Sequence, residues 1–131
     1  MGRLHHVRDG ELSDETAQSA GMRRAAAISG GLVGASSIWM GRAVVPPASA
    51  SANHHHGASE TAIYVVSGNP VFVFREPDTG RERRIETAPG DYVFVPPYVA
   101  HREENPSADA EAVVVLARST QEAIVVNLGS L

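Results

Sequence analysis

The chain has 131 residues and a mass of 13.8 kDa, long enough for one compact domain and too short for two ordinary ones. Hydrophobic residues make up 43% and charged residues 20% of the sequence, as in soluble globular domains rather than disordered chains. Lysine plus arginine number 11 and aspartate plus glutamate 15, so the net charge is −4 and a nucleic-acid partner is not expected. Because the sequence has no cysteine, disulfides, thiolate nucleophiles and cysteine-ligated metal sites are excluded.

Residues 1–21 are polar and have no sustained hydrophobic period, which predicts an N-terminal arm. The next stretch favours two strands, near residues 24–29 and 37–45, joined by a glycine-rich turn at 30–34. The domain proper is therefore expected to span residues 22–131.

The same stretch has a second interpretation, as an export signal. Arg23 and Arg24 precede an apolar run, and small residues at 48–52 resemble a cleavage site, as in twin-arginine signals. The glycines at 30–34 interrupt the apolar run, and Arg42 lies between it and the supposed cleavage site. Both features favour strands in a cytoplasmic protein over a signal.

Short apolar segments rich in β-branched and aromatic residues follow, separated by glycine and proline turns. They predict strands at residues 62–66, 71–74, 92–95, 112–116 and 123–126. This spacing indicates an all-β sandwich or small barrel. No apolar run reaches the length of a membrane span, so no membrane partner is expected.

The six histidines are the candidates for metal chemistry. His54, His55 and His56 are consecutive, and in an extended chain alternate side chains share a face. His54 and His56 are therefore expected to point together, with His55 pointing away. His101 follows the strand at 92–95 and a rigid Pro-Pro step, and neutral imidazoles of this kind bind Zn, Fe, Mn, Cu and Ni.

The surroundings of these histidines follow two spaced patterns. In the first, Ala48 precedes His54-x-His56 by five residues, four residues lead to Thr61, and six more lead to Gly68. This stretch, 48–68, is similar to the first cupin motif, G(x)5HxH(x)3,4E(x)6G, with two substitutions.

In the second pattern, Gly90 precedes Pro96-x-Tyr98 by five residues, His101 follows after two, and Asn105 after three more. This stretch, 90–105, is similar to the second cupin motif, G(x)5PxG(x)2H(x)3N, with one substitution. With both motifs present, the sequence resembles a small single-domain bacterial cupin.

The resemblance implies an all-β, cupin-type double-stranded β-helix, or jelly-roll barrel, that holds one divalent metal ion, Fe, Mn, Zn or Ni. It also implies metal ligands at His54, His56 and His101. The family's glutamate falls on Thr61, and Glu60 is one residue early, which would point it to the other face unless the strand carries a bulge. Two options follow: a three-histidine site, which we favour, or a site that Glu60 joins through a bulge.

Alternation places Ile63 and Val65 inside the barrel, and Trp39 or Met40 on the opposite wall. Such an apolar pocket suits a small organic ligand, although all of these residues could be ordinary core. Tyr98 replaces a family glycine near the barrel mouth and is a candidate acid or base, or a rim-packing residue.

Three neutral histidines leave a metal with its full charge and open positions, which suits a small organic substrate and, with iron, O2 activation. The sequence therefore predicts a metal-dependent cupin enzyme, with an oxygenase as the leading subclass. Addition of Glu60 would favour Mn or Zn and isomerase, decarboxylase or dehydratase chemistry. A non-catalytic metabolite-binding module is the alternative from another class. The resemblance also implies a homodimer, since an exposed edge formed by the first fifty residues could pair with a second copy.

Overall fold

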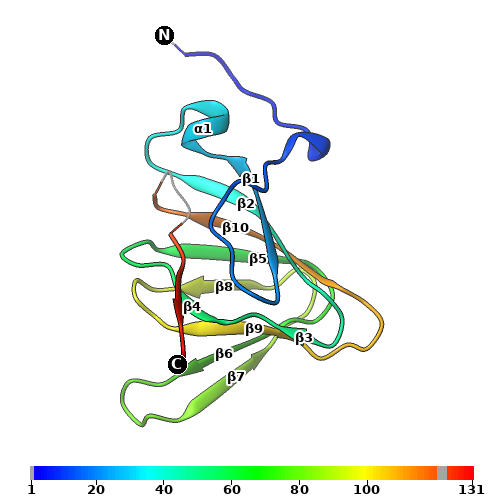
Figure 1. Ribbon diagram of the computed structural model, residues 1–131, viewed down its shortest axis with the longest axis vertical. Helices are drawn as coiled ribbons and strands as arrows, with labels where there is room; N and C mark the ends of the chain where they lie inside the picture. Colours follow the sequence, from blue (N-terminus) through cyan, green and yellow to red (C-terminus); the bar gives the residue numbers. More distant parts are fainter. Residues whose placement is uncertain (1, 121–123) are drawn as a thin grey trace.

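The computed structural model describes residues 2–120 and 124–131 as a barrel of two antiparallel sheets (Figure 1). One sheet has the strand order β1-β2-β10-β5-β8, and the other β11-β4-β9-β6-β7, with β3 paired to β9. The elements in chain order are η1 (Asp9–Glu11), β1 (Arg23–Ile28), α1 (Gly30–Val33), β2 (Trp39–Val45), β3 (Ser49–Ala50), β4 (Asn53–His55), β5 (Thr61–Ser67), β6 (Val71–Arg75), β7 (Glu82–Glu86), β8 (Tyr92–Val95), β9 (His101–Asn105), β10 (Ala112–Arg118) and β11 (Val126–Leu128). The expected all-β jelly-roll fold is confirmed.

The stretch 22–52 contains three strands, β1, β2 and β3. β1 and β2 pair antiparallel, and the expected glycine turn contains the one-turn helix α1. The Ser29 side chain accepts a hydrogen bond from the Leu32 amide at the start of this turn, and Gly34 ends it with a φ of 72°. The glycines that argued against an export signal therefore serve as turn residues between two paired strands.

The N-terminal arm is in contact with the barrel. Ser13 and Ala26 exchange backbone hydrogen bonds of 2.9 and 2.7 Å, so the arm covers part of the outer edge of β1. The side chain of Gln18 also bonds both the amide and the carbonyl of Arg24. The homodimer expected from this edge stays a prediction.

The predicted strand at 123–126 differs from the observed one. Ala123 lies outside the described residues, and β11 begins only at Val126, which pairs with His55 of β4. The physical reason is local, because the Ile124 carbonyl accepts a hydrogen bond from the His56 side chain.

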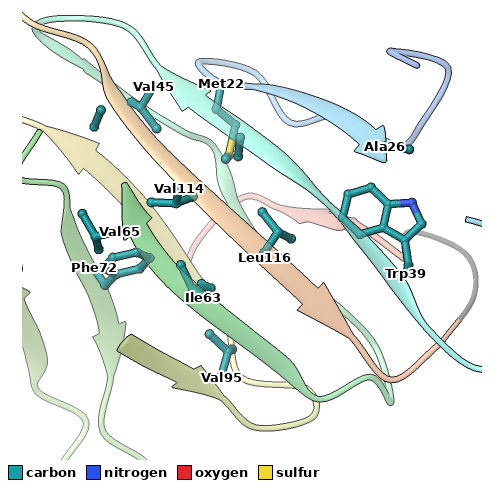
Figure 2. Close-up of a cluster of buried hydrophobic side chains, with 12 residues drawn as sticks. Met22, Ala26, Trp39, Val45, Ile63, Val65, Phe72, Val95, Val114 and Leu116 are labelled. Atoms are coloured by element: carbon teal, nitrogen blue, oxygen red, sulfur yellow. The ribbon is translucent and has the colours of Figure 1, made fainter. Parts of the chain in front are cut away.

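The apolar core lies between the sheets, mainly on the inward faces of β2, β5 and β10 (Figure 2). Ile63, Val65, Val114 and Leu116 are all at most 4% exposed, as strict alternation requires. Trp39 closes one end of this cluster (Figure 2). Met40 is 39% exposed and faces out. Within the described part of the chain, neither helix is long and apolar enough to cross a membrane.

Candidate metal centre

Two short strands of one sheet bring three histidines together. β4 and β9 pair antiparallel with His54 directly opposite His101, and His56 follows two residues after His54 on the same side. The three side chains are buried, with exposed fractions of 0%, 4% and 3% for His54, His56 and His101. Their candidate ligand nitrogens all lie within 4.8 Å of one another.

The backbone determines which nitrogen of each ring faces this cluster. Each Nδ1 lies within hydrogen-bond distance of a backbone carbonyl oxygen: His54 with Ala52 at 2.8 Å, His56 with Ile124 at 2.9 Å and His101 with Val99 at 3.0 Å. A carbonyl only accepts, so in a neutral ring the proton resides on Nδ1 and Nε2 carries the lone pair. This is the arrangement in which histidines bind metals.

Burial keeps two of the rings neutral. Desolvation lowers the pKa of His54 to about 4, against the opposite effect of the nearby Glu103 carboxylate. Desolvation, together with the charge of Arg118, lowers the pKa of His56 to about 2. Both rings are therefore neutral at physiological pH, as metal ligation requires.

A buried carboxylate, which the two motifs do not mark, faces the histidines. Glu103 is 4% exposed, and its oxygens lie 3.6 Å from His54 Nε2 and 3.7 Å from His101 Nε2. Burial by itself would raise the pKa of this carboxyl, but its interactions with His101, His54 and Arg24 hold the pKa well below the usual range. Glu103 is therefore ionised, and its oxygens face the Nε2 atoms of His54 and His101.

Glu103 could have been found from the sequence. It lies two residues after His101, so both project from the same face of β9. The signal was missed because the inward positions of β9 are polar, and the strand therefore lacks apolar alternation: His101, Glu103 and Asn105 are all buried.

Glu60 and Thr61 lie as alternation predicts. The Glu60 side chain is exposed, its amide bonds Ser119 Oγ, and it is not part of the histidine cluster. Thr61 takes the inward position at 1% exposure, and its hydroxyl has no hydrogen-bond partner in the described structure. No bulge turns Glu60 inward, which favours the three-histidine option over the site containing Glu60.

Comparison with known proteins identifies the family. The cupin-domain family model matches residues 41–117, more than half of the chain. The chain belongs to the cupin family. No curated protein sequence matches it.

Solved structures agree on the fold of this cupin. Peruvianin-I, described as a cysteine peptidase from Thevetia peruviana latex, superposes with a TM-score of 0.75 at 15% identity, covering 91% of this chain and 74% of that one. Oxalate decarboxylase from Bacillus subtilis superposes with a TM-score of 0.74 at 24% identity, covering 87% of this chain but only 29% of its own. Another structure of that decarboxylase, covered over 30% of its length, is described by its Mn(II) centres. At these identities the likeness shows the fold alone.

The residues of this cupin fit a divalent metal. His101 Nε2 is buried with no hydrogen-bond partner among residues 2–120 and 124–131, although a polar atom in such a place normally has one. A cation among the three Nε2 atoms would satisfy it and would lie beside the negative charge of the Glu103 carboxylate. It would also displace a contact from Arg24, whose Nη2 lies 3.2 Å from His54 Nε2.

An apolar cavity of about 660 Å³ opens beside the cluster. His101 forms part of its wall, with Phe72, Val95, Tyr98 and Leu131 among the other lining residues. Tyr98 is 66% exposed, has a φ of 62°, and its ring lies 5.9 Å from that of the half-buried His55. The tyrosine is thus at the rim of the cavity, and its role as acid or base stays a prediction.

Proposed function

We propose that this cupin is a metal-dependent enzyme that acts on a small organic molecule, with oxygenase chemistry as the leading subclass. The observation that carries the proposal is the convergence of three buried Nε2 atoms whose partner nitrogens are bonded to backbone carbonyls. His54, His56 and His101 would hold one divalent ion. Once bound, such an ion polarises an oxygen ligand and, if it is iron, can activate O2.

The chain's own residues would orient the metal ligands, receive the substrate and exclude bulk water from the site. The carbonyls of Ala52, Ile124 and Val99 orient the three rings, so little reorganisation is needed on binding. The apolar cavity beside His101 would receive the substrate and exclude bulk water. Tyr98 at the rim would be within reach of a substrate in that cavity.

Glu103 favours a second candidate function, a non-redox lyase or isomerase. A carboxylate 3.6 Å from one proposed ligand nitrogen and 3.7 Å from another adds negative charge and an oxygen donor to the site. Oxygen donors suit Mn, and a mixed histidine–carboxylate set suits Zn, neither of which needs to change oxidation state. A non-catalytic module that binds a metabolite is the remaining alternative.

Elemental analysis tests the metal site. The protein is purified, reconstituted with Fe(II), Mn(II), Zn(II) or Ni(II), desalted, and analysed for metal per chain. We expect one ion per chain, and its loss in His54→Ala, His56→Ala and His101→Ala. His55→Ala is the matched control, because His55 lies on the same strand but outside the cluster.

The outcomes separate the candidates. Metal content near zero in the wild type, or unchanged in His101→Ala, contradicts the site. Retention of iron together with substrate-dependent O2 consumption supports the oxygenase, whereas retention of Mn or Zn with turnover and no O2 consumption supports the non-redox enzyme. Ligand binding without turnover under either condition supports the binding module.

A further inference from the structure

Arg118 is a buried cation without hydrogen bonds. It is 2% exposed, and in the described part of the chain none of its three guanidinium nitrogens, Nε, Nη1 or Nη2, has a hydrogen-bond partner. Its Cζ lies 4.6 Å from the ring centroid of Trp39. Stacking of this kind stabilises the face of the guanidinium but leaves its five N–H donors unused.

The surrounding charges do not balance this arginine. The charged side chains that the structure describes as buried are Arg24, Glu103 and Arg118, which leaves one net positive charge inside the barrel. Burial lowers the pKa of Arg118 to about 9, which still leaves it protonated at neutral pH. An unpaired buried charge is strongly destabilising, so an anionic partner is expected at this place.

Arg118 lies in a row of inward-facing residues that leads to the cavity. On β10 it pairs with Thr61 of β5, and Thr61 pairs in turn with Val95 of β8. All three are buried, so they project from the same inner face of the sheet. Val95 lines the apolar cavity, and His101 lines it from the other sheet.

Thr61 supplies a second unused donor in this row. Its hydroxyl is buried and, like the arginine nitrogens, has no partner within the described residues. Neighbouring strands are about 4.8 Å apart. Thr61 lies on β5, next to the strand β8 whose Val95 lines the cavity, and Arg118 lies on β10, on the other side of β5. Two cross-strand neighbours with unused donors, Arg118 and Thr61, thus lie in the row whose other end, Val95, lines the cavity.

We propose that Arg118 and Thr61 bind the carboxylate group of a small organic ligand whose apolar body occupies the cavity beside His101. The guanidinium fork matches a carboxylate in bidentate geometry, and in the metal-free protein one carboxylate cancels the one net positive charge of the buried side chains. A phosphate monoester carries about −1.5 to −2 at neutral pH and would overcompensate it. The inference rests on the proposed function only in placing this ligand next to the metal.

Hexanoate and hexanamide are suitable probes, because they share the apolar chain and differ in the charge of the head group. Their affinities are measured by calorimetry at constant ionic strength, for metal-loaded and for chelator-treated protein. Trp39 provides a second readout, because it is the only tryptophan of the chain and stacks on Arg118. We expect hexanoate to bind at least about tenfold tighter than hexanamide and to change the Trp39 fluorescence.

Two variants address the two donors. Arg118→Met removes the guanidinium but keeps an apolar chain over Trp39, and we expect it to abolish the preference for hexanoate while hexanamide binding is unchanged. Thr61→Val keeps the shape of the side chain and is expected to weaken hexanoate binding by a few-fold. Arg42→Gln is the matched control, since it removes one positive charge from β2 at a side chain that is 38% exposed and paired with Asp9.

The result that overturns the proposal is a hexanoate preference that is absent from the wild type or unchanged in Arg118→Met. If Arg118→Met fails to fold, hexanoate binding is measured on Arg118→Lys instead. A lysine lacks the bidentate fork, so weaker hexanoate binding supports the proposal and unchanged binding overturns it. Inorganic phosphate that binds tighter than hexanoate and displaces it overturns the carboxylate assignment.

The same experiment separates this proposal from the metal site. Hexanoate binding that depends on Arg118 in protein that takes up no metal upholds the carboxylate site and contradicts the metal enzyme. Normal metal content together with hexanoate binding that does not depend on Arg118 upholds the metal site and contradicts the carboxylate site.

Discussion

His54 lies directly opposite His101 in the β4–β9 pair, with ring centroids 4.4 Å apart. This single register joins the two motifs of the sequence in one cluster. A one-residue slip would turn one of the two rings to the outer face of the sheet. The candidate metal centre therefore depends on the register of a very short strand pair as much as on the identity of its residues.

Replacement of Glu103 tests whether its carboxylate contributes to metal binding. Glu103→Gln keeps the shape but removes a charge that faces His54 and His101. We expect the affinity for Mn(II) or Zn(II), measured by competition with a chelator, to fall about 10- to 100-fold.

Glu60→Gln is the matched control, because Glu60 is exposed and outside the cluster. It should bind metal as the wild type does. Equal affinities of Glu103→Gln and the wild type would show that the carboxylate plays no part in metal binding.

The metal-free protein should lose stability in acid. The pKa of His54 is lowered to about 4 and that of His56 to about 2, so below pH 6.5 the unfolded chain binds protons that the folded chain does not. The free energy of unfolding should therefore be highest above about pH 6.5 and fall as the pH drops toward 4, by up to about 1.4 kcal/mol per pH unit for each histidine.

Urea denaturation between pH 4 and 8 after chelator treatment measures this dependence. The slope should flatten in His56→Gln, which removes one of the two titrating groups. A wild-type profile that is flat from pH 7 to 5 would contradict the assignment of neutral, buried rings.

Gly41 on β2 should not tolerate a side chain. A Cβ at this position would lie 2.3 Å from the Ala25 carbonyl oxygen and 2.5 Å from the Trp39 ring. Because backbone would have to move, Gly41→Ala should destabilise the protein by about 1–3 kcal/mol in urea denaturation.

Gly10→Ala serves as the comparison, since a Cβ at Gly10 has nothing within 4 Å. It should be close to neutral. A Gly41→Ala protein as stable as the wild type would show that β1 and β2 can separate without cost.

Asn105 should be important for stability rather than for metal binding. Its buried Nδ2 donates to the carbonyls of Val45, Pro46 and Ala110, at 3.0, 3.2 and 2.8 Å. Asn105→Ala leaves these acceptors without that donor and should cost about 2–4 kcal/mol of unfolding free energy.

Asn105→Asp should be worse at neutral pH, because it places a buried negative charge against the same carbonyl oxygens. Thermal denaturation ranks the two variants, and their metal content should match that of the wild type. An aspartate variant more stable than the alanine variant would contradict this account of Asn105.

Sequence reasoning worked best where structure is local. Alternation placed Ile63 and Val65 inside, and both are buried. Alternation also placed Glu60 on the opposite face from Thr61, and the side chains lie that way. Such inferences hold because a strand's two faces follow from its backbone geometry, whatever it pairs with.

The sequence failed where the inner face of a strand is polar. β9 carries His101, Glu103 and Asn105 inward, so it has no apolar period, and Glu103 was not expected beside the histidines. The strand β7 also lacks the apolar alternation that predicts a strand, because all five of its residues are exposed and neither of its faces is buried.

By itself, the sequence determined an all-β fold through its short apolar segments and turns, and its two motifs implied the cupin fold and the grouping of three histidines through resemblance to the family. Only the tertiary structure decided what surrounds them. Arg24, Glu103 and Arg118 come from three strands, β1, β9 and β10, and all three are buried through pairings between distant parts of the chain. No local pattern encodes those pairings, because they depend on how two sheets close around one interior and on which charges that interior must balance.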